Sequence, residues 1–175
     1  MNTRRAFLHN TFLGGLAAGT ADFWLKTADL FGAPAKGAFP VVIATWDNRR
    51  ATATAWEILS NGGRALDAVE AGARVPEADP EDTSVGYGGF PDRDGNVTLD
   101  ACIMDELGNA GSVLFLEHIK HPISVARAVM EKTPHVILAG SGALQFALDQ
   151  GFKKENLLTE VARKAWEEWK IKAEF

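Results

Sequence analysis

The stretch from residue 79 to residue 117 constrains the fold of this chain more than any other part. Three of the four residues in 86–89 are glycine, and an Asp-Arg-Asp-Gly turn signal follows at residues 92–95. Two runs of strand-like composition come next, at residues 96–104 and 110–116. Glycine-dense loops can bring backbone close to a substrate, and strand runs separated by turn residues are typical of a hairpin. The sequence therefore predicts a loop followed by a β-hairpin.

Composition excludes several classes of protein. The chain has 175 residues, of which 46% are hydrophobic and 23% charged, as in one ordinary globular domain. A net charge of −5 without a basic cluster argues against nucleic-acid binding, because phosphate binding needs a concentrated positive surface. The single cysteine, Cys102, leaves no internal disulfide framework. No apolar run approaches the ~20 residues that span a bilayer, so no membrane partner is expected.

The N-terminal segment has the features of an export signal. An arginine pair at residues 4–5 precedes a modest apolar run, and a small-residue site suited to cleavage follows at residues 33–35. This order is typical of twin-arginine signals, whereas the alternative is a tail with two chance arginines. We expect residues 1–35 to be a signal segment, residues 36–175 to form the domain, and the protein to be exported to a bacterial periplasm.

Hydrophobic spacing predicts a mixture of helices and strands. Apolar side chains recur at helical spacing in residues 51–60, 65–75, 124–132, 143–150 and 159–172. Continuous apolar runs at residues 39–45 and 135–139 predict two buried strands. The fold class is therefore α/β, or α+β with an antiparallel component.

Three side chains are candidates for a functional site, and each has a structural alternative. Trp46 follows the predicted strand at residues 39–45, where it could pack at the rim of the core or form the wall of a ligand site. Asp100 lies within an apolar strand run, where a carboxylate must face solvent or find partners. Ser84 precedes the glycine loop and is weak evidence by itself.

Other motifs favour structure over chemistry. The Gly-Ser-Gly run at residues 140–142 lacks the lysine of a Walker loop and the third glycine of a dinucleotide fingerprint. The acidic turn at residues 92–96 lacks the later bidentate glutamate of a calcium loop. His118, His121 and His135 share no metal-ligand spacing with one another or with the cysteine. We expect no metal and no other cofactor.

Several short motifs occur together from about residue 39 to the end of the sequence. They include residues 45–46 (TW), 55–57 (AWE), 62–70 (GGRALDAVE), 79–80 (DP), 84–89 (SVGYGG), 97–101 (VTLDA), 118–120 (HIK), 122–127 (PISVAR), 133–136 (TPHV) and 151–152 (GF). This combination resembles the glycosylasparaginase (aspartylglucosaminidase) family, which belongs with the isoaspartyl peptidases and L-asparaginases. The combination is highly specific to that family.

The resemblance implies an α+β fold, the αββα sandwich of N-terminal-nucleophile hydrolases, with only its N-terminal, α-chain portion present. Relatives are made as a precursor that cuts itself just before a threonine. The new threonine is the nucleophile, and its free α-amine acts as the base. The substrate implied is a small glyco-amino acid, N4-(β-N-acetylglucosaminyl)-L-asparagine. Its amide bond is cleaved through an acyl-enzyme, from which water releases aspartate.

The scission motif of the family, His-Asp-Thr-Ile-Gly, does not occur in this sequence. The resemblance therefore assigns no catalytic residue to the chain, and it implies that activity needs the β portion of the same precursor, in an oligomer of αβ units. Three supporting positions carry over from the family. Trp46 is expected to line the pocket, Ser84 to approach the nucleophile and its amine, and Asp100 to be a buried polar partner.

Two other functions stay open at this point. An L-asparaginase or isoaspartyl peptidase of the same fold would differ mainly in loops outside this sequence. A truncated, non-catalytic remnant would only bind or pair with another chain.

Overall fold

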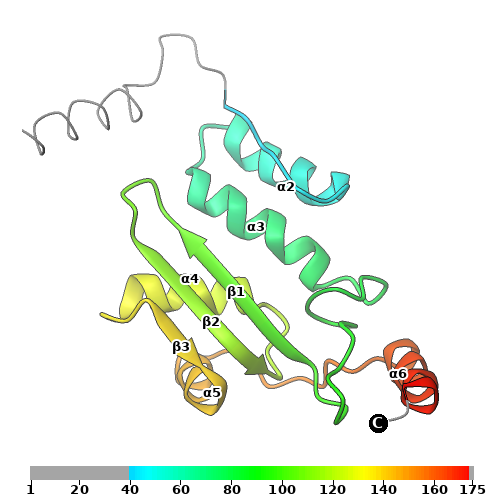
Figure 1. Ribbon diagram of the computed structural model, residues 1–175. Coiled ribbons are helices and arrows are strands. Elements are labelled where there is room, and N and C mark those ends of the chain that lie inside the picture. Colours follow the sequence, from blue (N-terminus) through cyan, green and yellow to red (C-terminus); the bar gives the residue numbers. More distant parts are fainter. Residues whose placement is uncertain (1–39, 174–175) are drawn as a thin grey trace, which may run out of the picture. The chain divides into compact units, whose positions relative to one another are not determined.

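The computed structural model describes residues 40–173 of the chain (Figure 1). The chain divides into two units, Met1–Phe39 and Pro40–Phe175, and only the second is described. The expected signal segment at residues 1–35 lies outside the described residues, so that segment and its boundary stay predictions. Within the described part, no helix has the length and apolar character needed to cross a membrane.

Two helices, α2 (Arg49–Ser60) and α3 (Ala65–Glu77), pack side by side. The Asn48 side chain begins α2 by accepting a hydrogen bond at 2.9 Å from a backbone N–H of its first turn, which satisfies one of the open amides at the helix end. Small residues let the two helices approach closely, because a Cβ on Gly72 would lie 3.2 Å from the Cβ of Ala55. Both helices confirm the predictions from hydrophobic spacing.

A small mixed sheet contains three strands in the order β1 (Thr98–Met104), β2 (Ala110–Glu117) and β3 (Ile137–Ala139). β1 and β2 pair antiparallel, which confirms the predicted hairpin, and β3 pairs parallel to β2. An irregularity at Asp100 interrupts the register of the hairpin. Such bulges locally bend and twist a strand and redirect its side chains.

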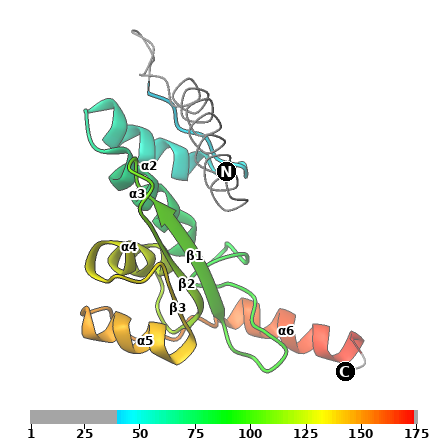
Figure 2. The ribbon, with the colours of Figure 1, turned by 60° about the vertical axis from the view of Figure 1, so that its left-hand side comes forward.

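Helices α4 (Pro122–Lys132) and α5 (Gly140–Asp149) lie on the same side of the sheet (Figure 2). The side chains buried between them and the sheet include Ile103, Val113, Leu116, Val125, Val129, Ala143 and Ala147. α4 lies so close to β2 that a Cβ on Gly111 would be 2.2 Å from the carbonyl oxygen of Ala126. The core therefore lies between one face of the sheet and these two helices.

The opposite face of the sheet has no covering layer within residues 40–173. Alternate residues of a strand point to opposite faces. Most positions on this side are exposed, namely Asp100, Cys102, Met104, Leu114, Ile137 and Ala139, whereas Ser112 is half-buried. β1 and β3 are the edge strands of the sheet. The described residues thus form one sheet with one helical layer, and the expected four-layer αββα sandwich is not confirmed by them.

Residues 40–45 do not form the buried strand that their apolar run predicted. Val41 and Ile43 are 68% and 85% exposed, and no strand of the described residues pairs with this segment. A strand needs a neighbour to complete its hydrogen bonds, so apolar composition alone does not form one. β3 likewise is not the buried strand expected at residues 135–139, because Ile137 is 53% exposed at the sheet edge.

The last helix, α6 (Glu160–Lys172), docks on the turn at residues 92–95. The indole Nε1–H of Trp166 donates a hydrogen bond to the carbonyl oxygen of Arg93 at 3.2 Å. The same ring covers Gly95, where a Cβ would lie 3.0 Å from it. The helix expected at residues 159–172 is confirmed, and Trp166 is its anchor on the domain.

Candidate functional site

A pocket of about 650 Å³ opens between the segment that leads into α2, helices α2 and α3, and the loop after α3. Its polar lining side chains are those of Thr45, Asp47, Asn48, Thr52, Asp82 and Ser84. Apolar side chains form most of the rest, including Trp46, Val69 and Ala73. A pocket of this size with a few convergent polar groups suits a small ligand. Two of the three predicted site residues, Trp46 and Ser84, line it together.

Trp46 lines this pocket from the segment that precedes α2. The side chain is 84% exposed, so it does not belong to the core of the described residues. Its carbonyl oxygen accepts the Asn48 N–H at 2.8 Å in a tight turn that directs the chain into α2. An exposed indole on a pocket wall can pack against a ligand, and that role stays a prediction.

Asp82 and Ser84 form a compact turn in the loop after α3, where both line the pocket. Asp82 Oδ1 accepts the Ser84 N–H at 2.9 Å and also accepts the Ser84 hydroxyl at 2.5 Å. Because the hydroxyl donates its proton to this carboxylate, the lone pairs of Ser84 Oγ can accept a hydrogen bond from a group in the pocket. The arrangement can therefore orient an ammonium or hydroxyl donor.

The glycines that follow Ser84 let the loop approach the end of α3. Gly86 has a φ of +57°, and a Cβ there would lie 2.1 Å from the carbonyl oxygen of Glu77. Gly88 has a φ of +106°. Glycine has no Cβ, so it can adopt a left-handed backbone conformation and can pack this closely against another backbone. The Tyr87 N–H also donates to the Glu77 carbonyl oxygen at 2.8 Å. The close approach that the glycines allow is therefore to α3, whereas the sequence suggested an approach to a substrate.

Sequence analysis missed the buried carboxylate of Glu77, which is 5% exposed. Its Oε1 accepts the Ile123 N–H at 3.0 Å, and its Oε2 lies 3.1 Å from Nδ1 of His121. Burial raises the pKa of Glu77, while the hydrogen bonds from His121 and the Ile123 N–H and the charge of Arg74 act against that increase. These hydrogen-bond partners are 44 and 46 residues away in the sequence, so no local pattern could indicate them.

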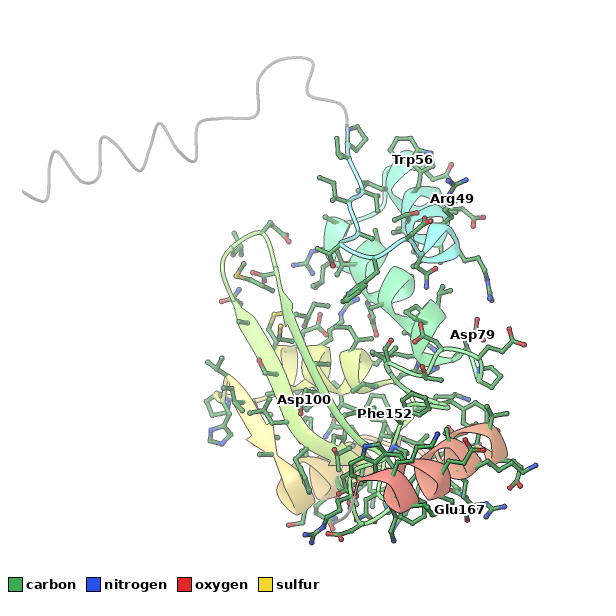
Figure 3. All side chains as sticks on the ribbon, turned by 45° about the vertical axis from the view of Figure 1, so that its right-hand side comes forward. Arg49, Trp56, Asp79, Asp100, Phe152 and Glu167 are labelled. Carbon is green, nitrogen blue, oxygen red and sulfur yellow. The ribbon has the colours of Figure 1, made fainter. Side chains whose placement is uncertain are left out.

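Asp100 lies apart from the lining of the pocket, on β1 (Figure 3). It is exposed among the described residues, and its expected role as a buried polar partner stays a prediction. The exposure arises because Asp100 lies on the uncovered face of the sheet. Its Oδ1 accepts the Phe115 N–H at 2.7 Å, at the bulge where Phe115 has a φ of +52°. The carboxylate thereby satisfies an amide that regular strand pairing would have satisfied.

The acidic turn is confirmed as a structural feature. Asp92 Oδ1 accepts the N–H groups of Asn96 and Asp94, both at 2.9 Å, and these bonds, led by that from Asn96, hold the pKa of Asp92 below its ordinary value. The Gly-Ser-Gly run forms the first turn of α5, directly after β3. From residue 40 to residue 173, no group of three or more His, Cys, Asp or Glu side chains is arranged to hold a metal.

Comparison with known families identifies the class of protein. The family model described as "Asparaginase" matches residues 39–175. The chain therefore belongs to this asparaginase family of N-terminal-nucleophile hydrolases. Within the family, the resemblance to glycosylasparaginase is confirmed by the relatives that follow.

Three relatives carry the name N(4)-(β-N-acetylglucosaminyl)-L-asparaginase. The chain is 67% identical to the one from Elizabethkingia miricola, 46% identical to that of Mus musculus and 44% identical to that of Rattus norvegicus, each over 131 residues. Each alignment covers 74% of this chain and 38% of the relative. The chain thus spans well under half the length of the relatives it matches.

Proposed function

We propose that this chain is the α-chain portion of an amidohydrolase that cleaves the amide bond of N4-(β-N-acetylglucosaminyl)-L-asparagine. The observation that carries the proposal is the placement of Trp46 and Ser84 on one pocket, in a chain 67% identical to a relative named for that activity. These are two of the positions for which the family resemblance implies a role at the substrate pocket.

In the proposed reaction, a threonine freed by self-cleavage of a longer precursor attacks the amide carbonyl, and its own α-amine accepts the hydroxyl proton. The carbon–nitrogen bond breaks, the leaving nitrogen takes a proton, and an ester joins aspartate to the threonine. Water then hydrolyses that ester and releases aspartate. Trp46 packs against the substrate, and Ser84 Oγ accepts a hydrogen bond from the threonine's ammonium or hydroxyl group.

The uncovered sheet face supports a partnership with the β portion of the same precursor. Met104, Leu114 and Ile137 are 66%, 42% and 53% exposed on this face. Exposed apolar surface and open strand edges favour the addition of another layer. In an αββα sandwich, a second sheet would cover this face and bury Asp100. It could also supply the neighbour that residues 40–45 need to become a strand.

Localisation and assembly are part of the same proposal. We infer export to a bacterial periplasm from the order of the arginine pair, apolar run and small-residue site within residues 1–35. The functional unit is an oligomer of αβ units. An L-asparaginase or isoaspartyl peptidase remains the second candidate, because the matching family is described by the broader name.

The DNA that follows the codon for Phe175 gives the first test. An in-frame His-Asp-Thr segment supports the precursor, whereas a stop with no such reading frame supports a non-catalytic remnant. Substrate class is then decided with the complete protein, by measuring aspartate released from glycosylated asparagine, from free asparagine and from an isoaspartyl peptide. A higher kcat/KM for the glycosylated substrate is expected. A preference for free asparagine or for an isoaspartyl peptide would overturn the assignment.

A further inference from the structure

We propose that Glu77 is a positioning residue for the pocket wall that carries Ser84. Its buried carboxylate ties the end of α3 to the start of α4, and its main-chain carbonyl group supports the glycine loop. The importance of Ser84 in catalysis rests on the proposed function, but the link from Glu77 to the loop rests on geometry alone.

The carboxylate side of this link is fixed in a place with little water. The side chain of Glu77 is 7% exposed and that of His121 is 19% exposed. α4 begins at Pro122, so the Ile123 N–H that donates to Glu77 at 3.0 Å is one of the helix's open amides. A carboxylate at a helix N-terminus is also favoured by the helix dipole. Glu77 therefore caps α4, although it belongs to α3.

The backbone side of the link leads directly to the loop. The Glu77 carbonyl oxygen accepts the Tyr87 N–H at 2.8 Å. Gly86 packs so closely on the same residue that a Cβ there would lie 2.4 Å from the Glu77 Cα. Ser84 is two residues before Gly86. The contact between Gly86 and the Glu77 backbone leaves no free space. A displacement of Glu77 must therefore also move the backbone next to Ser84.

The same turn of α3 also forms part of the pocket. Ala73 and Pro76 line it, together with Ser84 from the loop. Glu77 follows Pro76 in the sequence, but its carboxylate contacts α4 and does not line the pocket. It thus connects two walls of the pocket, the end of α3 and the loop, to the first turn of α4.

Glu70 provides a matched control on the same helix. Its carboxylate also bridges α3 to α4, through the Ser124 hydroxyl at 2.5 Å and the Arg127 guanidinium at 2.7 Å. Among the described residues, no hydrogen bond or ion pair joins it to residues 83–90. If Glu77 only stabilised the contact between the two helices, replacing either carboxylate would have the same effect on the loop.

The test is amide hydrogen exchange, measured by mass spectrometry on peptides of the whole chain in dilute solution. Glu77→Ala is expected to accelerate exchange in residues 83–90 by about ten- to a hundredfold, the range for loss of a buried hydrogen-bonded group. The β1–β2 hairpin serves as the internal reference, since global unfolding would accelerate both peptides. Glu70→Ala should leave the ratio of the exchange rate of the loop peptide to that of the hairpin peptide unchanged. Glu77→Gln keeps an acceptor for the Ile123 N–H, so its loop peptide should retain most of the protection seen in the wild type.

His121→Ala keeps the test decisive if Glu77→Ala does not fold. It removes the second partner of the carboxylate without altering α3, and it should loosen the same loop peptide by a smaller factor. Unchanged exchange of residues 83–90 in both variants, or equal effects of Glu70→Ala and Glu77→Ala, would overturn the proposal. Because no substrate is involved, such a failure would leave the proposed hydrolase function untouched.

Discussion

Nδ1 of His121 lies 3.1 Å from Oε2 of Glu77, and both side chains are largely shielded from solvent. Burial, as the largest effect, raises the pKa of Glu77 above its ordinary value of 4.5. The folded chain therefore binds the Glu77 proton more tightly than the unfolded chain does. The stability that this group contributes is fully present below its unfolded pKa and is lost as pH rises through the raised pKa.

The first prediction concerns Glu77→Gln, which removes this titration. The stability of the wild-type chain relative to the variant should decrease as pH rises from about 4.5 toward neutrality. The measurement is the free energy of unfolding by urea at several pH values in dilute solution. Glu57→Gln, on the exposed surface of α2, is the control. A difference between wild type and Glu77→Gln that stays constant with pH, or increases, would contradict the assigned direction of the pKa shift.

A second prediction separates close approach from backbone strain in the glycine loop. Gly86 and Gly108 both have positive φ, at +57° and +82°. A Cβ on Gly86 would lie 2.1 Å from the Glu77 carbonyl oxygen, whereas a Cβ on Gly108 would have no neighbouring atom within 4 Å. We expect Gly86→Ala to cost roughly 3 kcal/mol or more and Gly108→Ala about 1 kcal/mol in unfolding free energy. Equal costs would show that the loop does not rest tightly on α3.

Local sequence signals predicted the elements of the fold well. The strand runs at residues 96–104 and 110–116 specify the hairpin, and the turn signal at residues 92–95 specifies the turn that precedes it, because turn chemistry and strand composition act over a few residues. Helical spacing of apolar residues likewise indicated all five described helices. Residues 40–45 are the clear exception. Their apolar composition suits a strand, but strand formation depends on a neighbour that the local sequence does not supply.

The candidate site was less accessible to sequence reasoning. The roles of Trp46 and Ser84 at a substrate pocket came from the family resemblance, and the structure adds that both line one pocket. The exposure of Asp100 could not be read from its strand, since burial depends on which layers cover the sheet. Glu77 had no signal, because its hydrogen-bond partners lie at the start of a distant helix and its burial is a tertiary effect.

A third prediction tests how α6 is attached. Trp166 packs on Gly95, and its indole donates to the Arg93 carbonyl oxygen. Trp166→Ala should release the helix and increase tryptic cleavage after Lys164 by about tenfold or more, because local opening is what exposes a helix to proteases. Val161→Ala, at a position 69% exposed on the same helix, should have little effect. Cleavage after Arg127 in α4 reports global unfolding, and parallel increases at both sites would argue against a local anchor.

A fourth prediction concerns the uncovered face of the sheet. The chain alone should bind a hydrophobic dye, because apolar side chains of this face and the sheet edges are open to solvent. Replacing Leu114 and Ile137 together by serine should reduce the dye fluorescence. Leu107→Ser is the control, since Leu107 is 80% exposed but lies in the turn of the hairpin. Failure of the wild-type chain to bind the dye would mean that this face is not a site for another layer.

The most direct measurement of the central proposal is the release of aspartate from N4-(β-N-acetylglucosaminyl)-L-asparagine by this chain, alone and joined to the β portion of its precursor. The chain alone should be inactive, and the complete protein should hydrolyse the amide. Ser84→Ala in the complete protein should lower kcat by about ten- to a thousandfold, the range for loss of one positioned hydrogen bond at the reacting group. Hydrolysis by residues 1–175 unaided, or a complete protein without activity on this amide, would contradict the proposal.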